Sequence, residues 1–543
     1  MKKFDCQFPD ICVDDKKNYL DRGELMQLAP EGIFEKLEAE FERRKDIIQA
    51  TESDWTLGEG GFVRYVSMSD GDDNNDGLTP ETAWKTIERI VIAQQAKAVR
   101  AGDVVLFKRG DEWHKKLATA QGVTYSAYGE GPKPRILGSV EADSPEQWLT
   151  TDVPNVYKFL GKFTLESDVG NIVFNDGECF GQRVLKDVTK DETLPAGGNN
   201  VVGNGINTWL MDPRPFASYK DLAKIAEDIP VADLMYYFDL EEGGLYLYSK
   251  EGNPGKRFWS VELCTRGNGV WATSGVTLDN LCIRYPGSHG VGAGTCKNLV
   301  VRNCEVGYIG GAIQFIKDGR IVRFGNAIEI YGMADGFYVY NNYIHQCFDC
   351  GPTAQWSGNV PEGKQLISKD IHYYDNILRE AGLEIWYSTH SEMTDDTYCK
   401  LIECNMYNNM VTGSGTGWKA YNHQKQEWCA FYGGPETNAP YIDCYMADNY
   451  FWGNRRHLMK AVPTSMNGDY GFKWVNNVII HELDAGSIGY MSNELETARG
   501  EKCYYYDKET VAELVERGGL GDNFFFYTPG DKKDRRISLG MYR

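Results

Sequence analysis

Four polar side chains occupy comparable places in a sequence phrase that repeats along the chain, and together they could carry out acid–base chemistry. They are Glu329 in NAIEIYG, Gln355 in CGPTAQW, Glu384 in AGLEIWY and Lys419 in GTGWKAY. If each phrase forms a strand and the strands stack in parallel, the four side chains line up on one face, about 4.8 Å apart per layer. Such a column would combine two carboxylates, an amide and an ammonium group.

Three carboxylates in this region have the chemistry needed to cleave a glycosidic bond. Besides Glu329 and Glu384, Asp349 lies in the turn HQCFDCG, just before the strand that carries Gln355. Cleavage needs one carboxyl group that protonates the leaving oxygen and a second that attacks the anomeric carbon or activates water. Neighbouring layers give separations of roughly 5 to 10 Å, which suits both stereochemical outcomes. The alternative is that these side chains are solvated surface residues.

Further side chains near the column are suited to contact a sugar. Aromatic rings offer flat apolar faces, and amides, imidazoles and ammonium groups bind hydroxyls. The candidates are Gln314, Gln355, Trp356, Trp386, Tyr387, His390, Trp418, Lys419 and His423. For Trp356 and Trp386, packing at the rim of the site is an equal alternative. We expect His289, in GSHGVGAG, to be structural, although the column could extend as far as this residue. His345 could orient Asp349 or pack in the core.

The repeat itself predicts a solenoid. Asn recurs at intervals of 23 to 40 residues, and an apolar alternation follows each one, as in Leu281-Cys282-Ile283 and Ile377-Leu378. Such spacing is typical of the layers of a β-solenoid, and the strands of successive layers must be parallel because the chain always winds the same way. Asn suits the turns because it tolerates the left-handed conformation and stacks in amide ladders. The recurring residues are Asn280, Asn303, Asn342, Asn376, Asn409, Asn449 and Asn477.

Five segments are expected from changes in pattern. We predict an N-terminal helical arm, a first coil and cap, a β-rich insertion with a hairpin at the EEGG turn, a main β-helix that carries the active-site face, and a C-terminal cap with a short helix in KETVAELVERGG. Their ranges are 1–57, 58–140, 141–258, 259–482 and 483–543. The arm could pack on the solenoid or on a second copy of the chain, which would make a homo-oligomer.

Two sets of motifs resemble a known group of proteins. The run YVSMSDGDDNNDGLTPETAWKTI, followed by GDVVLFKRGD and GVTYSAYGEGPKP, resembles the opening coil of right-handed parallel β-helix proteins of the pectate-lyase-like superfamily. RFGNAIEIYG, YIHQCFDCGPTAQW and AGLEIWY resemble segments of β-helical glycoside hydrolases, a group that includes β-xylosidases and α-fucosidase-like enzymes.

The resemblance implies an all-β fold, a right-handed parallel β-helix with a β-rich insertion and small helical N- and C-terminal segments. It also implies that Asp349 and Glu384 are the catalytic pair of a glycoside hydrolase, with Glu329 as a third carboxylate. Cys350 stands where that group usually has Ala after the Asp.

Composition limits the partners. The net charge of −21 disfavours nucleic acid and anionic membranes, because a strongly negative field repels phosphates. No apolar run is long enough to span a membrane. The 14 Cys fit no disulfide framework, and we expect Cys347 and Cys350 to be buried free thiols. The N-terminus has no apolar segment typical of a secretory signal, which predicts a cytoplasmic protein with an oligosaccharide as its partner.

Two other functions stay open, together with one cofactor. A polysaccharide lyase of the same fold would use Lys419 as its base and often calcium to neutralise a uronate, whereas a non-catalytic β-helix would only bind carbohydrate. We expect no cofactor. Calcium is the alternative for the acidic run Asp70, Asp72, Asp73 and Asp76, whose spacing does not match an EF-hand and is more typical of a solvated turn.

Overall fold

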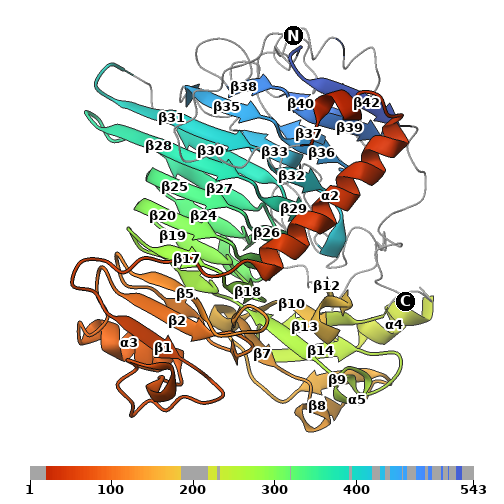
Figure 1. Ribbon diagram of the computed structural model, residues 1–543. Helices are drawn as coiled ribbons and strands as arrows, with labels where there is room; N and C mark the ends of the chain where they lie inside the picture. The colour runs from red at the N-terminus through yellow and green to blue at the C-terminus, as the bar shows by residue number, and fades with distance from the viewer. Residues whose placement is uncertain are drawn as a thin grey trace.

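The chain winds into a parallel β-helix of three long sheets (Figure 1). We name the sheets A, B and C in the order in which each layer passes through them. The computed structural model describes residues 20–184, 218–228, 233–317, 320–389, 394–418, 429–433, 441–454, 457–460, 472–482, 487–491, 503–505, 512 and 521–528. The predicted parallel β-helix is confirmed, whereas the helix predicted near the C-terminus lies almost wholly outside the described residues.

Each sheet takes one strand from nearly every layer. Sheet A contains β1 (Val63–Val66), β2 (Val104–Lys108), β5 (Thr124–Tyr128), β17 (Thr277–Asp279), β20 (Cys296–Arg302), β25 (Ala334–Tyr340), β28 (Gln365–Tyr374), β31 (Tyr398–Tyr407), β34 (Tyr441–Ile442), β35 (Cys444–Ala447) and β38 (Phe472–Val475). Sheet B contains β3 (Glu112–Trp113), β6 (Arg135–Leu137), β18 (Cys282–Arg284), β21 (Glu305–Ile309), β26 (Tyr343–Cys347), β29 (Ile377–Arg379), β32 (Met410–Thr412), β36 (Tyr450–Trp452), β39 (Val478–Glu482) and β42 (Phe524–Thr528). Sheet C contains β4 (Leu117–Ala118), β16 (Val270–Trp271), β19 (Val291–Ala293), β24 (Ile328–Tyr331), β27 (Pro352–Gly358), β30 (Leu383–Thr389), β33 (Cys429–Gly433), β37 (His457–Lys460), β40 (Ser487–Met491) and β41 (Cys503–Tyr505).

Every second residue of these strands points into the helix and is buried. Ile330 of β24 pairs with Ala354 of β27, which pairs with Ile385 of β30, and all three are fully buried. Burial of one Leu or Ile side chain contributes about 1.5 to 3 kcal/mol, so a stack of such layers supports the fold. If the pairing of a strand shifted by one residue, its buried apolar side chains would point to solvent. The alternation of apolar and polar residues therefore determines which face of each strand points outward.

An asparagine ladder runs along the turn between sheets A and B. The Nδ2 group of each ladder residue donates to the Oδ1 atom of the next, at 2.7 to 3.0 Å. The amides are buried except that of Asn523, which is partly buried, and each also donates to a backbone carbonyl, so their hydrogen bonds are satisfied. Asn280 and Asn303 are outside the ladder and adopt the left-handed conformation, with φ of 60° and 54°. The ladder consists of Asn342, Asn376, Asn409, Asn449, Asn477 and Asn523.

The long N-terminal helix covers the outer face of sheet B. Helix α2 (Pro30–Ala50), which follows the short α1 (Arg22–Leu25), crosses the strands of sheet B diagonally (Figure 1). Its Phe41 packs edge-on against Tyr343 and Trp452, with ring centroids 6.2 and 6.0 Å apart. The arm was predicted to pack either on the solenoid or on a second copy of the chain, and in the structure it packs on its own solenoid.

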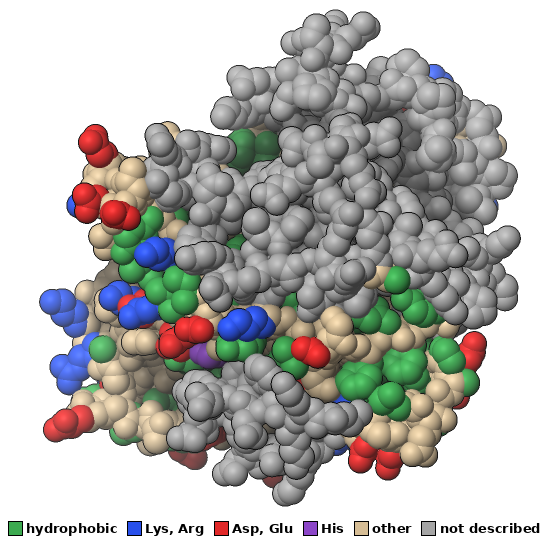
Figure 2. Space-filling view, turned by 90° about the horizontal axis from the view of Figure 1, so that it is seen from above, with side chains coloured by type: hydrophobic (Ala, Val, Ile, Leu, Met, Phe, Trp, Pro, Cys, Tyr) green, Lys and Arg blue, Asp and Glu red, His purple; other side chains and the backbone are tan. Residues whose placement is uncertain are grey.

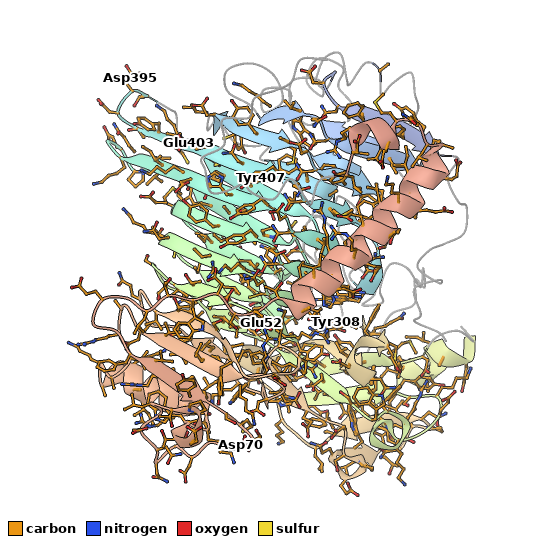
Figure 3. All side chains as sticks on the ribbon, viewed as in Figure 1. Glu52, Asp70, Tyr308, Asp395, Glu403 and Tyr407 are labelled. Carbon is orange, nitrogen blue, oxygen red and sulfur yellow. The ribbon has the colours of Figure 1, made fainter. Side chains whose placement is uncertain are left out.

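The β-rich insertion enters where the chain would pass from sheet B to sheet C. Its two sheets are mostly antiparallel, and the predicted EEGG hairpin is present as β13 paired with β14. Tyr308, labelled in Figure 3 near the junction of the solenoid and the insertion, donates to the carbonyl of Gly177 at 3.0 Å. The strands are β7 (Ser139–Glu141), β8 (Trp148–Thr150), β9 (Val156–Phe159), β10 (Val169–Phe174), β11 (Cys179–Phe180), β12 (Gln182–Val184), β13 (Met235–Asp239), β14 (Gly244–Tyr248) and β15 (Val261–Thr265).

Among the described residues, charges of both signs are mixed on the surface. No helix among the described residues is both long and apolar enough to cross a bilayer. In the view of Figure 2, acidic and basic side chains lie close together along one edge. Ion pairs such as Lys297–Asp335 at 3.3 Å on sheet A show the same mixing.

Candidate active site

The outward face of sheet C carries two adjacent columns of side chains. In the first column the register pairs Glu329 with Thr353, and Thr353 with Glu384. In the second column it pairs Tyr331 with Gln355, and Gln355 with Trp386. The outward face was predicted correctly, but the position of Gln355 beside Glu329 and Glu384 was wrong by two residues. Gly351 and Gly382 come into line, so Thr353 rather than Gln355 stands between the two glutamates.

The three predicted carboxylates are almost inaccessible to solvent. Glu329, Asp349 and Glu384 have exposed fractions of 3%, 6% and 8%. Burial of a carboxylate is costly unless hydrogen bonds or nearby charges compensate. Solvated surface glutamates would not be enclosed in this way, so the structure argues against the surface alternative.

His289 holds Glu329 in place. Its Nε2 atom lies 2.7 Å from Glu329 Oε2, and its Nδ1 atom accepts the backbone N–H of Asn326 at 3.1 Å. Because Nδ1 accepts, the ring proton belongs on Nε2, where it points at the carboxylate. The ring also stacks on Phe324, with centroids 4.9 Å apart. Of the two alternatives for His289, the structure supports the one in which the column reaches it, since its ring contacts Glu329.

Glu329 is held in its ionised form. Burial raises its pKa, but the His289 ring and the N–H donors of Gln355 and Asn326 outweigh burial and leave the pKa below its ordinary value. Asn326 Nδ2 donates to Oε1 at 3.2 Å, and Gln355 Nε2 donates to the same oxygen. Both carboxylate oxygens are thus occupied, which suits a fixed negative charge better than a proton donor.

The segment Gly325–Asn326 links Asp349 to Glu329. Gly325 N–H donates to Asp349 Oδ2 at 2.8 Å, and the N–H of Asp349 returns to the Gly325 carbonyl at 2.9 Å. Asn326 Oδ1 accepts the N–H of Cys350 at 2.9 Å, while its Nδ2 reaches Glu329. Two carboxylates that are 20 residues apart in sequence therefore share one backbone segment.

The insertion supports this segment through buried charges. Asp168 and Arg183 form an ion pair with both side chains fully buried, and Asp168 Oδ2 also accepts the N–H of Ile313 at 2.6 Å. Arg323 donates to the carbonyl of Gly311 at 2.6 Å, and burial together with Arg183 lowers its pKa to about 9. Ile313 and Arg323 belong to the hairpin of β22 (Ile313–Lys317) and β23 (Arg320–Arg323), which leads directly into Gly325.

Glu384 lies two layers beyond Glu329 in the same column. Strand spacing places their Cα atoms about 9.6 Å apart. Thr353, between them, donates through Oγ1 to Glu384 Oε2 at a long 3.5 Å. Trp386, two residues further along β30, is partly exposed and lies beside Gln355. The structure thus keeps Glu384, Gln355 and Trp386 on the candidate face.

Several predicted sugar contacts point elsewhere. Tyr387 is fully buried, accepts from Ser368 Oγ at 2.8 Å and donates to the Gly332 carbonyl at 3.0 Å, because it is on the inward side of β30. Trp356 has the same inward parity and packs against the core. Trp418 is fully buried against Phe348. The prediction that Tyr387 and Trp418 contact sugar was therefore wrong, whereas Trp356 follows the alternative of packing.

Gln314 has a structural position. Its Oε1 accepts from Ser288 Oγ at 2.9 Å, and its Nε2 donates to the carbonyls of Gly287 and Ala312 at 3.2 and 2.9 Å. These contacts fix the residues just before His289, so Gln314 supports the site and does not face a substrate. His390, Lys419 and His423 lie outside the described residues, and their predicted roles are unchanged.

His345 does not orient Asp349. It lies on sheet B, where its Nε2 is 3.1 Å from Glu305 Oε1. Glu305 also accepts from Arg284 at 2.6 Å and from Gln49 of α2 at 2.6 Å. Burial raises the pKa of Glu305, but Arg284 and His345 lower it well below its ordinary value. The pair His345–Glu305 fastens α2 to the solenoid.

Sequence reasoning missed Trp271 and Tyr331. Each is half exposed, at 51% and 50%, on the outward face of sheet C. The pattern around Trp271 could have revealed it, since its neighbours Val270 and Ala272 are both buried. Tyr331 follows Glu329 at the next outward position of the same strand.

No metal site is evident in the part of the chain that the structure describes. No group of three or more His, Cys, Asp or Glu there is arranged to hold an ion. In the acidic run, Asp73 accepts the N–H groups of Lys85 and Thr86 at 2.8 and 2.9 Å, next to the start of α3 (Ile87–Gln95). Asp70 pairs with Lys108. These carboxylates act as local caps and ion-pair partners.

Comparison with known proteins finds distant likeness among solved structures. No protein-family model matches the sequence, and no curated protein sequence matches it. Among solved structures, the complex of XylC with xylose aligns with 86% of this chain and 83% of its own, at a TM-score of 0.42 and 13% identity. A glycoside hydrolase aligns over 89% and 99%, at 0.40 and 10%. The GH136 lacto-N-biosidase from Eubacterium ramulus aligns over 87% and 67%, at 0.32 and 11%.

Two of these solved structures are of proteins named as a glycoside hydrolase and a lacto-N-biosidase. Identities of 10 to 13% assign no role to any single residue of this chain.

Proposed function

We propose that the protein is a glycoside hydrolase that acts on oligosaccharides at the outward face of sheet C, as a β-xylosidase-like or related exo-glycosidase. The observation that carries this proposal is the presence of three nearly buried carboxylates, from different layers, on and beside one face. Glycosidic cleavage needs two carboxyl groups on either side of the bond. Gln355 and Trp386 supply an amide and a ring face beside them.

The contacts suggest different roles for the three carboxylates. Asp349 accepts a backbone N–H from Gly325, an interaction that favours the charged form. It is the carboxylate that attacks the anomeric carbon or activates water. We assign Glu384, which lies two layers from Glu329 in the first column, as the acid that protonates the leaving oxygen. Glu329, with both oxygens occupied, supplies fixed negative charge near the developing positive charge of the sugar.

Leaving-group dependence tests these roles. Hydrolysis of a panel of 4-nitrophenyl and 2,4-dinitrophenyl glycosides, β-xylosides included, is measured for the wild type, Glu384→Gln and Asp349→Asn. Loss of a general acid lowers the rate by about 10² to 10⁴ when the leaving group needs a proton. We expect Glu384→Gln to lose this factor on the poorer leaving group and to retain most of its activity on the dinitrophenyl substrate. Asp349→Asn loses activity on both.

Asp370→Asn is the matched control. Asp370 is also a β-helix carboxylate, hydrogen-bonded to His372 at 2.9 Å, but it lies on sheet A. The Asp370→Asn variant should be as active as the wild type on every glycoside. Equal losses in all three variants, or full activity in Asp349→Asn and Glu384→Gln, would place the reaction elsewhere on the molecule.

A further inference from the structure

An exposed tryptophan lies in the same column as the two glutamates, toward the first layers of the helix. The register pairs Trp271 of β16 with Gly292 of β19, and Gly292 with Glu329. Trp271 is therefore two layers before Glu329, about 9.6 Å away along the column. Its ring is half exposed, whereas Val270 and Ala272 on either side of it are buried.

The layer between Trp271 and Glu329 has glycines at its outward positions. Gly292 is in the first column, and Gly294, next to the end of β19, comes into line with Tyr331 in the second. A Cβ atom on Gly294 would meet no other atom within 4 Å, so open space lies over this position. The surface is therefore recessed for one layer, with Trp271 before the recess and Tyr331 after it.

An amide forms part of the floor of this recess. A Cβ atom on Gly292 would lie 2.2 Å from Asn268 Nδ2, so the missing side chain leaves room for the Asn268 amide. Asn268 Oδ1 accepts the backbone N–H of His289 at 3.1 Å, which turns Nδ2 away toward Gly292. The recess thus contains an N–H donor adjacent to the residue that holds Glu329.

We infer that this recess, formed by Trp271, Asn268, Gly292, Gly294 and Tyr331, binds an additional sugar ring of an oligosaccharide substrate. Half-exposed aromatic rings present flat apolar faces to a pyranose, and the Asn268 amide can bind a hydroxyl. The recess is continuous with the carboxylate columns, so the occupant is the same glycan that reaches Glu329 and Glu384. The inference rests on the proposed function for the reacting end of that glycan.

The chain then runs along the helix axis, with its reacting bond near Glu384 and its further sugars toward the first layers. A substrate of one sugar would leave the recess empty, whereas a longer substrate would fill it. The recess therefore selects for length, and its loss should weaken binding of long substrates only.

Binding measurements test the recess independently of the reaction. Xylotriose, cellotriose and maltotriose are titrated into the Glu384→Gln protein by calorimetry, together with xylose and glucose. We expect one trisaccharide to bind at least about tenfold more tightly than its monosaccharide, which corresponds to about 1.4 kcal/mol. Adding Trp271→Ala should remove this advantage, while Trp271→Phe should keep most of it.

Two further variants separate the recess from general damage. Gly294→Leu fills the open space without a clash at Cβ, and should abolish the trisaccharide advantage in a folded protein. Trp259→Ala removes another exposed tryptophan, which is 66% exposed on the segment that leads to β15, and should change nothing. In the otherwise wild-type enzyme, Trp271→Ala should leave kcat/KM for 4-nitrophenyl β-xyloside unchanged. The same variant should lower kcat/KM for 4-nitrophenyl β-xylobioside about tenfold.

The outcomes for the recess and for the reaction are distinct. Trp271-dependent binding of a trisaccharide without hydrolysis of any glycoside would support the recess and overturn the proposed reaction. Hydrolysis with equal effects of Trp271→Ala on short and long substrates, or no trisaccharide advantage in the Glu384→Gln protein, would overturn the recess.

Discussion

Replacing His289 with Phe should destabilise the protein in a pH-dependent way. Phe keeps the stacking on Phe324 but removes the 2.7 Å contact to Glu329 and the acceptor for the Asn326 N–H at 3.1 Å. A hydrogen bond to a charged group contributes about 1.5 to 3 kcal/mol, and a buried N–H without a partner costs about 1 to 3 kcal/mol. We expect a total loss of about 3 to 5 kcal/mol near neutral pH.

The sign of the pH dependence follows from Glu329. Its pKa in the folded protein is below the ordinary value of 4.5. The ionised form of Glu329 therefore contributes stability above about pH 4.5, and this contribution is lost as the pH falls through the lower folded pKa. Without the His289 ring the pKa of Glu329 rises, so the contribution shrinks. The difference between wild type and His289→Phe should be largest near pH 7 and smaller at pH 4.

Urea denaturation followed by tryptophan fluorescence, at pH 7 and pH 4, measures this difference. His372→Phe is the matched control, since His372 stacks on Tyr338 at 5.4 Å and contacts Asp370 at 2.9 Å. Asp370 is more accessible to water, with a side-chain exposure of 35%, so the control should cost only about 0 to 1 kcal/mol. A His289→Phe loss no larger than the control, or one independent of pH, would refute the reasoning.

Two further predictions concern the ladder and the face of β30. Asn376→Ala should lower the free energy of unfolding, measured by urea denaturation, by about 3 to 5 kcal/mol, because the buried amide bonds to both ladder neighbours and to a backbone carbonyl. Asn523→Ala, at the partly buried end of the ladder, should lower it clearly less. Equal losses in the two variants would contradict the ladder model. Tyr387→Phe should leave KM unchanged in the hydrolysis assay because the ring is inside the β-helix. Trp386→Ala should raise KM about tenfold. If Tyr387→Phe raised KM and Trp386→Ala did not, the assignment of inward and outward faces would be wrong.

Much of the fold could be predicted because it follows from neighbouring residues. The alternation in β24 and β30 shows which side chains are inward, and the recurring Asn residues mark the turns of successive layers. The EEGG turn predicts the hairpin of β13 and β14, and apolar spacing predicts α2. Each of these patterns depends on residues close together in the chain.

The candidate site could be predicted only in part. The sequence placed Glu329, Glu384 and Gln355 on an outward face, and the structure agrees. It placed Gln355 in the wrong column, because a shift of two residues leaves every side chain on the same face and so leaves no trace in the alternation. The same parity argument, applied to Tyr387, would have predicted its burial.

The sequence by itself determined the period of the fold, the inward and outward faces, and the chemical types available for catalysis, since these are properties of consecutive residues. Only the tertiary structure decided which layers come into register. That register depends on turn lengths and on ladder hydrogen bonds between residues 28 to 46 positions apart. It brings His289 to Glu329, separates His345 from Asp349, and places Trp271 in line with both glutamates.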